Sequence, residues 1–114
     1  MARSEGNLRI QDKVSSVFRN KIGEEFLREE IIDLVVNAYP GTNRSSVIPS
    51  DYCYNLINAG IAFNFHLFEH REVGLYRCLG EEYQYTGPIY WKKEQAGEWR
   101  DGKYRLWQDP RKHA

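Results

Sequence analysis

The sequence predicts an α+β fold of the winged helix-turn-helix type, with a three-helix core, a β-hairpin wing and an extra C-terminal β-hairpin. Two helix patterns stand near the N-terminus, and a polar turn follows the second one. An alternating strand pattern with a chain reversal comes after that turn. At 114 residues we expect a single domain over residues 1–114, with a core of about 8–93 and a hairpin extension at about 94–109.

The first helix is expected between Ile10 and Ile22. Apolar residues recur there at helical spacing, at Ile10, Val14, Val17, Phe18 and Ile22. Gly23 stands where the end of a helix favours glycine. Residues 25–27 are too few to assign by pattern, but a brief strand there suits the predicted fold.

The second helix is expected over residues 28–39. Glu29 and Glu30 fall in its first turn, where the helix dipole favours anions. Pro40-Gly41 ends it. Its apolar face comprises Leu27, Ile31, Leu34, Val35 and Ala38.

The polar run from Tyr39 to Asn55 is the most informative stretch of the chain. Thr42 or Asn43 can cap a helix, whereas Pro49 removes a backbone hydrogen bond and clashes with the preceding turn. We therefore expect a helical turn at 43–48, a break, and a further helix over 50–58.

The rest of the chain reads as strands and extended segments. We expect a strand over 63–68, a turn at 71–74 and a returning strand at 75–79, which together form the candidate wing. Residues 80–91 are expected to run in extended form over the core. Asp101-Gly102 between two alternating runs predicts a tight hairpin. The predicted core comprises Val14, Phe18, Ile31, Leu34, Val35, Leu56 and Leu67.

The polar run and the wing supply candidate groups for contacting nucleic acid. Side chains of Asn, Arg, Ser and Tyr bind phosphates and base edges. A helix starting near Asn43 would offer a phosphate seat with Arg44. Asn55 can pair with adenine. The candidate residues are Asn43, Arg44, Ser45, Ser46, Ser50, Tyr52, Tyr54, Asn55, Asn58, Arg71 and Arg77.

Structural roles compete with each of these assignments. Arg44 can be a solvated side chain beside an ordinary cap, and Tyr52 can be core. Ser50 can cap a helix, and Asn55 can hold a turn. Arg71 and Arg77 can be neutralised by the nearby Glu69 and Glu72.

The charge balance argues against non-specific nucleic-acid binding. Sixteen basic and sixteen acidic side chains give a formal net charge of zero, whereas such binders gain affinity from phosphate neutralisation. Residues 1–23 nevertheless carry +3 and residues 24–33 carry −4. No stretch approaches the ~20 apolar residues of a membrane span, so we expect a cytoplasmic protein with Cys53 and Cys78 as buried free thiols.

Catalytic interpretations are weaker, and we expect no enzyme, metal or cofactor. The sequence His66-Leu67-Phe68-Glu69-His70 has the spacing of inverted zinc peptidases. That chemistry needs both histidines on one helical face, whereas the segment reads as a strand. Cys53 with His66 or His70 is a conceivable nucleophile pair, but no residue is identified that would orient the histidine. No paired-carboxylate nuclease motif is identified.

Two segments, Arg28 to Asn55 and Phe68 to Trp91, resemble small, largely uncharacterised winged-helix-like domains of bacteria and archaea. The similarity covers about residues 26–93. Such domains occur alone or beside nuclease domains of restriction-type systems, so the resemblance implies DNA association by context. It carries over no catalytic residue.

We therefore expect a DNA-binding module that contacts duplex DNA, in restriction, defence or transcriptional control. The alternative is a protein-interaction module. In that case the aromatic hairpin at 97–107 would pair with another protein or a second copy of the chain.

Overall fold

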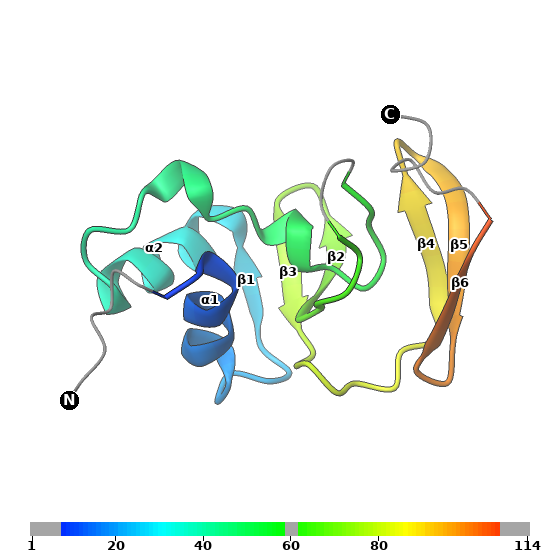
Figure 1. The fold of residues 1–114 in the computed structure, drawn as a ribbon, viewed down its shortest axis with the longest axis horizontal. Helices are drawn as coiled ribbons and strands as arrows, with labels where there is room; N and C mark the ends of the chain where they lie inside the picture. Colours follow the sequence, from blue (N-terminus) through cyan, green and yellow to red (C-terminus); the bar gives the residue numbers. More distant parts are fainter. Residues whose placement is uncertain (1–7, 59–61, 108–114) are drawn as a thin grey trace.

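The computed structural model describes residues 8–58 and 62–107. Figure 1 shows three layers along the longest axis, which are the helices with the first strand, a middle hairpin and a separate outer sheet. In chain order the elements are α1 (Ile10–Phe18), β1 (Glu25–Leu27), α2 (Arg28–Ala38), the 3₁₀ turns η2 (Arg44–Ser46) and η3 (Pro49–Tyr52), β2 (Phe68–Glu72), β3 (Leu75–Cys78), β4 (Gly87–Trp91), β5 (Glu94–Arg100) and β6 (Lys103–Leu106).

The first sheet has the order β1-β3-β2, and all of its pairs are antiparallel. Phe18 of α1 packs edge-on against Phe68 of β2, with ring centroids 5.1 Å apart. The helices and this sheet enclose the first hydrophobic cluster, because alternate strand residues face them. Its fully or nearly fully buried members include Val14, Phe18, Ile31, Val35, Val47, Leu67, Phe68 and Cys78.

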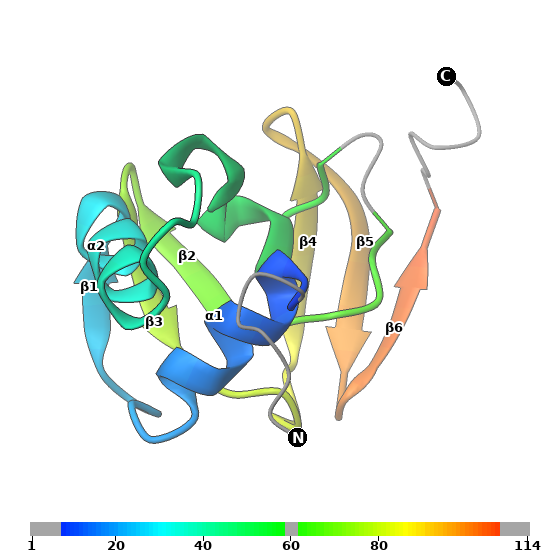
Figure 2. The same ribbon diagram turned by 60° about the vertical axis from the view of Figure 1, so that its left-hand side comes forward.

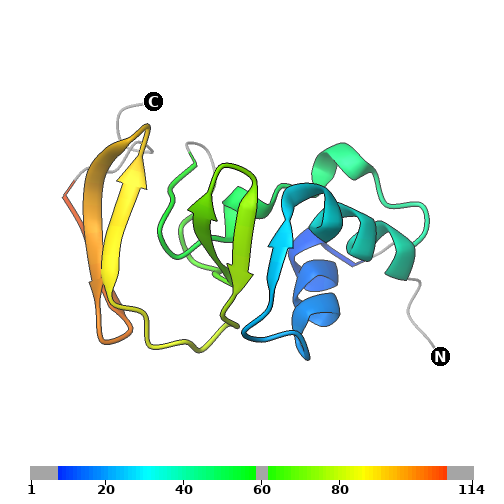
Figure 3. The same ribbon diagram turned by 180° about the vertical axis from the view of Figure 1, so that it is seen from behind.

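The second sheet has the order β4-β5-β6 and covers a separate aromatic cluster. Tyr54 lies at its centre, stacked on Tyr85 and edge-on to Trp99. The indole Nε1 of Trp99 donates a hydrogen bond to the carbonyl of Tyr54. Figure 3 shows from behind that the hairpin β2–β3 lies between the helices and this sheet.

Residues 53–57 connect the two sheets. Cys53 forms a parallel bridge with Phe68, and Leu56 forms one with Tyr90 of β4. The amide of Ile57 donates to the carbonyl of Tyr90 at 2.9 Å. Figure 2 shows η3 and the chain after it passing from the helices toward β4. We call residues 53–57 the linking segment.

Several predicted elements are confirmed. The brief strand at 25–27 and the second helix form, and the carboxylate of Glu30 accepts a hydrogen bond from the amide of Leu27 at the helix start. The reversal before β3 is present, and Asp101-Gly102 joins β5 to β6 with positive φ at both residues. The α+β class is confirmed.

The winged helix-turn-helix arrangement is not confirmed, because no α-helix forms over the described part of 43–58. Two 3₁₀ turns take its place. Pro49 opens the second turn, and the linking segment is extended because its backbone pairs with β2 and β4 instead of with itself.

Three other boundaries were wrong. The first helix ends at Phe18, not Ile22, because the chain turns so that the amide of Gly23 reaches the carbonyl of Cys78. The strand expected at 63–68 begins only at Phe68, since Phe63 fills the second cluster and Leu67 the first. Residues 87–91, expected to be merely extended, form β4.

The predicted core is largely confirmed. Five of its seven residues are buried, and Leu34 and Leu56 pack against the first cluster while half-buried. Leu27, assigned to the apolar helix face, belongs to β1 and is 54% exposed. Ala38 is exposed too, at the last turn of α2.

Candidate nucleic-acid interface

The turn at 43–46 is exposed and closed by its own side chains. Asn43 accepts hydrogen bonds at its Oδ1 from both the amide and the hydroxyl of Ser45, at 3.0 and 2.8 Å. Ser46 is exposed. The short 3₁₀ turn thus has one of its leading amides already satisfied, which weakens the predicted phosphate seat.

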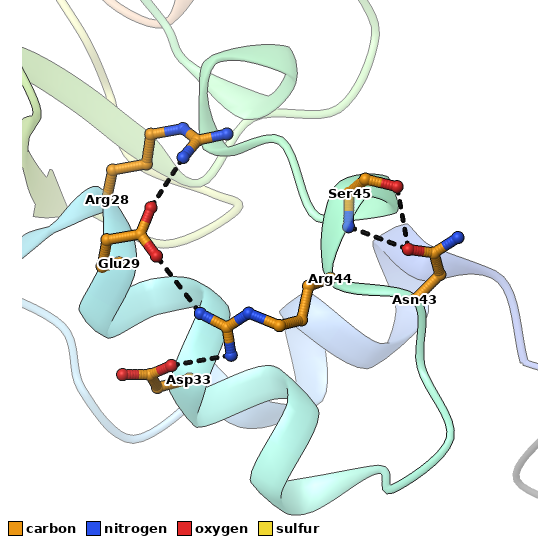
Figure 4. A network of polar contacts seen from close by, with 6 residues as sticks. All are labelled: Arg28, Glu29, Asp33, Asn43, Arg44 and Ser45. Atoms are coloured by element: carbon orange, nitrogen blue, oxygen red, sulfur yellow. Dashed lines mark hydrogen bonds and ion pairs between the residues drawn. The ribbon is translucent and has the colours of Figure 1, made fainter.

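Arg44 extends from this turn onto α2, as Figure 4 shows. Its guanidinium lies 2.8 Å from a carboxylate oxygen of Asp33 and 3.2 Å from one of Glu29. Arg28 also pairs with Glu29. The hydrogen bond to Asp33, supported by Glu29, raises the pKa of Arg44. All these groups are exposed to water, so the ion pairs are exchangeable.

Ser50 and Asn58 form a small polar network with Asp51. The side-chain amide of Asn58 donates to the hydroxyl of Ser50 at 3.0 Å and to the carboxylate of Asp51 at 2.7 Å. These contacts hold Asn58, which directly follows the linking segment, against η3. The arrangement fits a structural role for both predicted residues.

Tyr52 and Tyr54 are both buried, but in different hydrophobic clusters. Tyr52 belongs to the first cluster and packs edge-on against Phe65. Tyr54 belongs to the second cluster, where its hydroxyl donates to the carbonyl of Gly80. Burial raises the pKa of both phenols to about 12. Neither ring offers a face for stacking on a base.

Asn55 forms two hydrogen bonds with the main chain of β2. Its Nδ2 donates to the carbonyl of His70, and its Oδ1 accepts from the amide of His70, both at 2.9 Å. A side-chain amide thereby replaces a neighbouring strand at the sheet edge. This matches the structural role considered for Asn55 and leaves its amide engaged within the protein.

Arg71 and Arg77 lie on the outer face of the first sheet. Arg71 pairs with Glu69 at 2.9 Å and with Glu25 at 3.7 Å. The pair with Glu69 is the one that the sequence offered as the alternative to DNA contact by Arg71. Arg77 stands between Glu25 and Glu69 in the strand register. The predicted site residues are therefore not brought together: four lie in the turn at 43–46, two on this sheet face, and the other five are engaged in contacts within the protein.

The charge of the region around these residues is acidic. Residues 24–86 carry ten acidic and four basic side chains, a net charge of −6. Sequence reasoning noted the acidic run at 24–33 but missed that Glu29 and Asp33, one helical turn apart, hold Arg44. Their i,i+4 spacing was the signal available for it.

The described residues contain no group of three or more His, Cys, Asp or Glu side chains able to hold a metal ion. His66 lies in the aromatic cluster, whereas His70 packs beside Tyr76 of the first sheet. Cys53 and Cys78 are buried free thiols, as predicted. Burial raises the pKa of Cys53 well above its usual value, which disfavours the thiolate that a nucleophile needs.

Among the described residues, no helix is both long and apolar enough to cross a membrane.

The chain belongs to the family described as "Domain of unknown function (DUF7225)", which it matches over residues 9–106. It is similar to the uncharacterized protein YnaC of Bacillus subtilis (strain 168), with 40% identity over 99 residues. The match covers 82% of this chain and 37% of that relative, so the chain spans well under half of the relative's length. No solved structure matches the chain at a significant level.

Proposed function

We propose that this domain is a non-catalytic module that binds duplex DNA through phosphate contacts. The observation that carries the proposal is the exposed turn at 43–46, in which Arg44, Ser45 and Ser46 follow one another and are all exposed to solvent. The element order also supports it, since two helices and a turn precede a hairpin whose strand β3 pairs with β1. That order suits a winged-helix module with its third helix reduced to turns.

Binding would work by exchange of ion pairs. Arg44 is held by Glu29 and Asp33 in water-exposed pairs, which are individually weak and screened by salt. A DNA phosphate would compete with both carboxylates, and the neighbouring phosphates add to its field. The side chains of Asn55 and Asn58 are committed within the protein, so the proposal assigns them no base contacts.

The test is a fluorescence-anisotropy titration of a labelled duplex at several salt concentrations. We expect weak binding, because few phosphates are contacted, with affinity that falls as salt rises. Arg44→Ala should weaken binding to all sequences alike and flatten the salt slope by ~1 unit. Arg100→Ala, which removes an exposed arginine paired with Glu98 on the second sheet, is the matched control and should bind as the parent does.

Absence of binding at low salt by the folded protein would refute the proposal. Unchanged DNA affinity in a folded Arg44→Ala protein would refute the site.

A second candidate function is protein binding through the second sheet. Tyr104 lies on the edge strand β6 and is 43% exposed, and Trp107 directly follows that strand and is 49% exposed. Exposed aromatic side chains on an unpaired edge favour pairing with another chain. The net charge of −6 over residues 24–86 also disfavours DNA. A sedimentation series showing concentration-dependent dimers, lost in Trp107→Ser, would support this alternative.

The family resemblance adds a context to the DNA proposal, which is action beside a nuclease of a restriction-type system. The relative YnaC is much longer than the match, which suits a domain that works within a larger protein. Fusing the chain to a nuclease domain should raise that nuclease's affinity for DNA only if the DNA proposal holds.

A further inference from the structure

A polar cavity of about 480 Å³ lies beside the outer face of the first sheet. Tyr76 and Cys78 of β3 pack in the first cluster, so Arg77 between them points to the opposite face. The segment 83–86 forms the other wall. The volume falls in the range of about 300–1,000 Å³ that small-molecule sites occupy.

Arg77 lines this cavity, and no carboxylate of the described residues forms an ion pair with it. Its neighbours on the adjacent strands, Glu25 and Glu69, both form ion pairs with Arg71. Among residues 8–58 and 62–107, the buried Nε of Arg77 meets no hydrogen-bond acceptor. A buried donor without an acceptor destabilises the folded state, so native proteins rarely keep one without a reason.

The remaining lining suits an anion. Tyr85 donates its hydroxyl to Glu69 at 2.7 Å, which occupies the second oxygen of that carboxylate. Three ionised side chains line the cavity, and two of them, Glu69 and Arg71, pair with each other. Arg77 is the third, and Glu25, which pairs with Arg71 from beside the cavity, balances the local charge. The hydroxyl of Thr86 accepts a hydrogen bond from the amide of Asp101 at 2.9 Å, and a hydroxyl can donate one as well. Gln84 also lines the cavity.

We propose that this cavity binds a small molecule carrying one oxyanion group, a carboxylate or a phosphate, on the guanidinium of Arg77. Two oxygens of such a group match the fork of N–H donors on arginine. The ring of Tyr83 at the mouth would cover the ligand's apolar part. The site is separate from the turn at 43–46 and does not rest on DNA binding.

The test uses ¹⁵N-labelled protein and follows the Nε–H resonance of Arg77 by NMR, assigned by its disappearance in Arg77→Gln. Sodium acetate, sodium benzoate and sodium phosphate are titrated separately at constant ionic strength, with chloride as the balancing ion. We expect a saturable shift with at least one probe. Acetate and benzoate report a carboxylate site, and phosphate reports a phosphate site.

Variants locate the binding. In Arg77→Gln, saturable shifts of the backbone amides of 83–86 should weaken at least tenfold, while Arg100→Gln should stay within twofold of the parent. Gln84→Ala, an exposed substitution, should weaken binding two- to tenfold and serves if Arg77→Gln does not fold. Shifts that are linear in every probe and equal to those in chloride would overturn the proposal. Undiminished binding in folded Arg77→Gln would do so too. A duplex oligonucleotide that shifts the Arg77 resonance where the small probes do not would also overturn it.

Discussion

Arg44 is held by two carboxylates that compete with any phosphate for it. Glu29→Gln with Asp33→Asn should therefore strengthen DNA binding, partly by removing negative charge near the DNA and partly by freeing the guanidinium. In an Arg44→Ala background there is no guanidinium to free, so the two substitutions should increase DNA affinity clearly less than they do in the parent. Anisotropy titrations of the four proteins give the coupling. Equal gains in the two backgrounds would mean that Arg44 does not meet the phosphate.

His66 is a buried imidazole surrounded by the rings of Tyr54, Phe63, Trp99 and Tyr104. Burial lowers its pKa to about 4 from the ordinary value of 6.5. Below pH 6.5 the unfolded chain therefore binds a proton that the folded protein does not. Stability is fully present above pH 6.5 and is lost as the pH falls toward 4, by at most about 1.4 kcal/mol per unit.

The measurement compares the parent with His66→Leu, which has a similar volume and cannot titrate. Urea unfolding at pH 7.5, 6.5, 5.5 and 4.5 should show the parent losing stability relative to the variant only below pH 6.5. A constant difference over that range would show that His66 takes up its proton equally in both states.

At the scale of elements, the linking segment 53–57 replaces the expected third helix and depends on Asn55. Asn55→Ala removes both hydrogen bonds to His70 and leaves a half-buried amide and carbonyl of β2 without those partners. We expect a loss of about 1–3 kcal/mol in unfolding free energy. Asn64→Ala, at an exposed asparagine, should change stability little.

The same variant separates structural from recognition roles. DNA affinity of folded Asn55→Ala should equal that of the parent, because the side chain faces β2. A stable Asn55→Ala protein with altered sequence preference would instead restore Asn55 as a base reader.

At the scale of the molecule, the linking segment 53–57 connects the two hydrophobic clusters, and the hydroxyl of Tyr85 in the second cluster donates to Glu69 of β2. All three tryptophans, Trp91, Trp99 and Trp107, lie in or beside the second sheet, whereas both cysteines are buried in the first cluster. Tryptophan fluorescence and thiol labelling therefore report different halves. We expect coincident urea midpoints, because the linking segment contributes Cys53 to one cluster and Tyr54 to the other.

Trp99→Phe offers the matched perturbation, since it removes the hydrogen bond to Tyr54 and keeps an aromatic ring. It should lower both midpoints together. A second sheet that melts first, while Cys53 and Cys78 stay protected from labelling, would show that the clusters fold independently.

The sequence by itself determined the elements whose signals are local. The apolar spacing of residues 28–38 with Glu30 at the start specifies α2, and Asp101-Gly102 with positive φ specifies the β5–β6 hairpin. Most of the buried core followed from the same periodicity. The prediction that Cys53 and Cys78 are free, buried thiols followed from their spacing, which matches no metal site.

Only the tertiary structure decided what residues 53–57 do. Their backbone groups pair with β2 and β4, which come later in the chain, and this long-range pairing overrode a helix pattern already weakened by Pro49. The partners of Arg44 and Asn55 likewise come from other segments. Side-chain type and spacing state which contacts a residue is able to make, whereas the fold selects among them by bringing one partner close and taking another away.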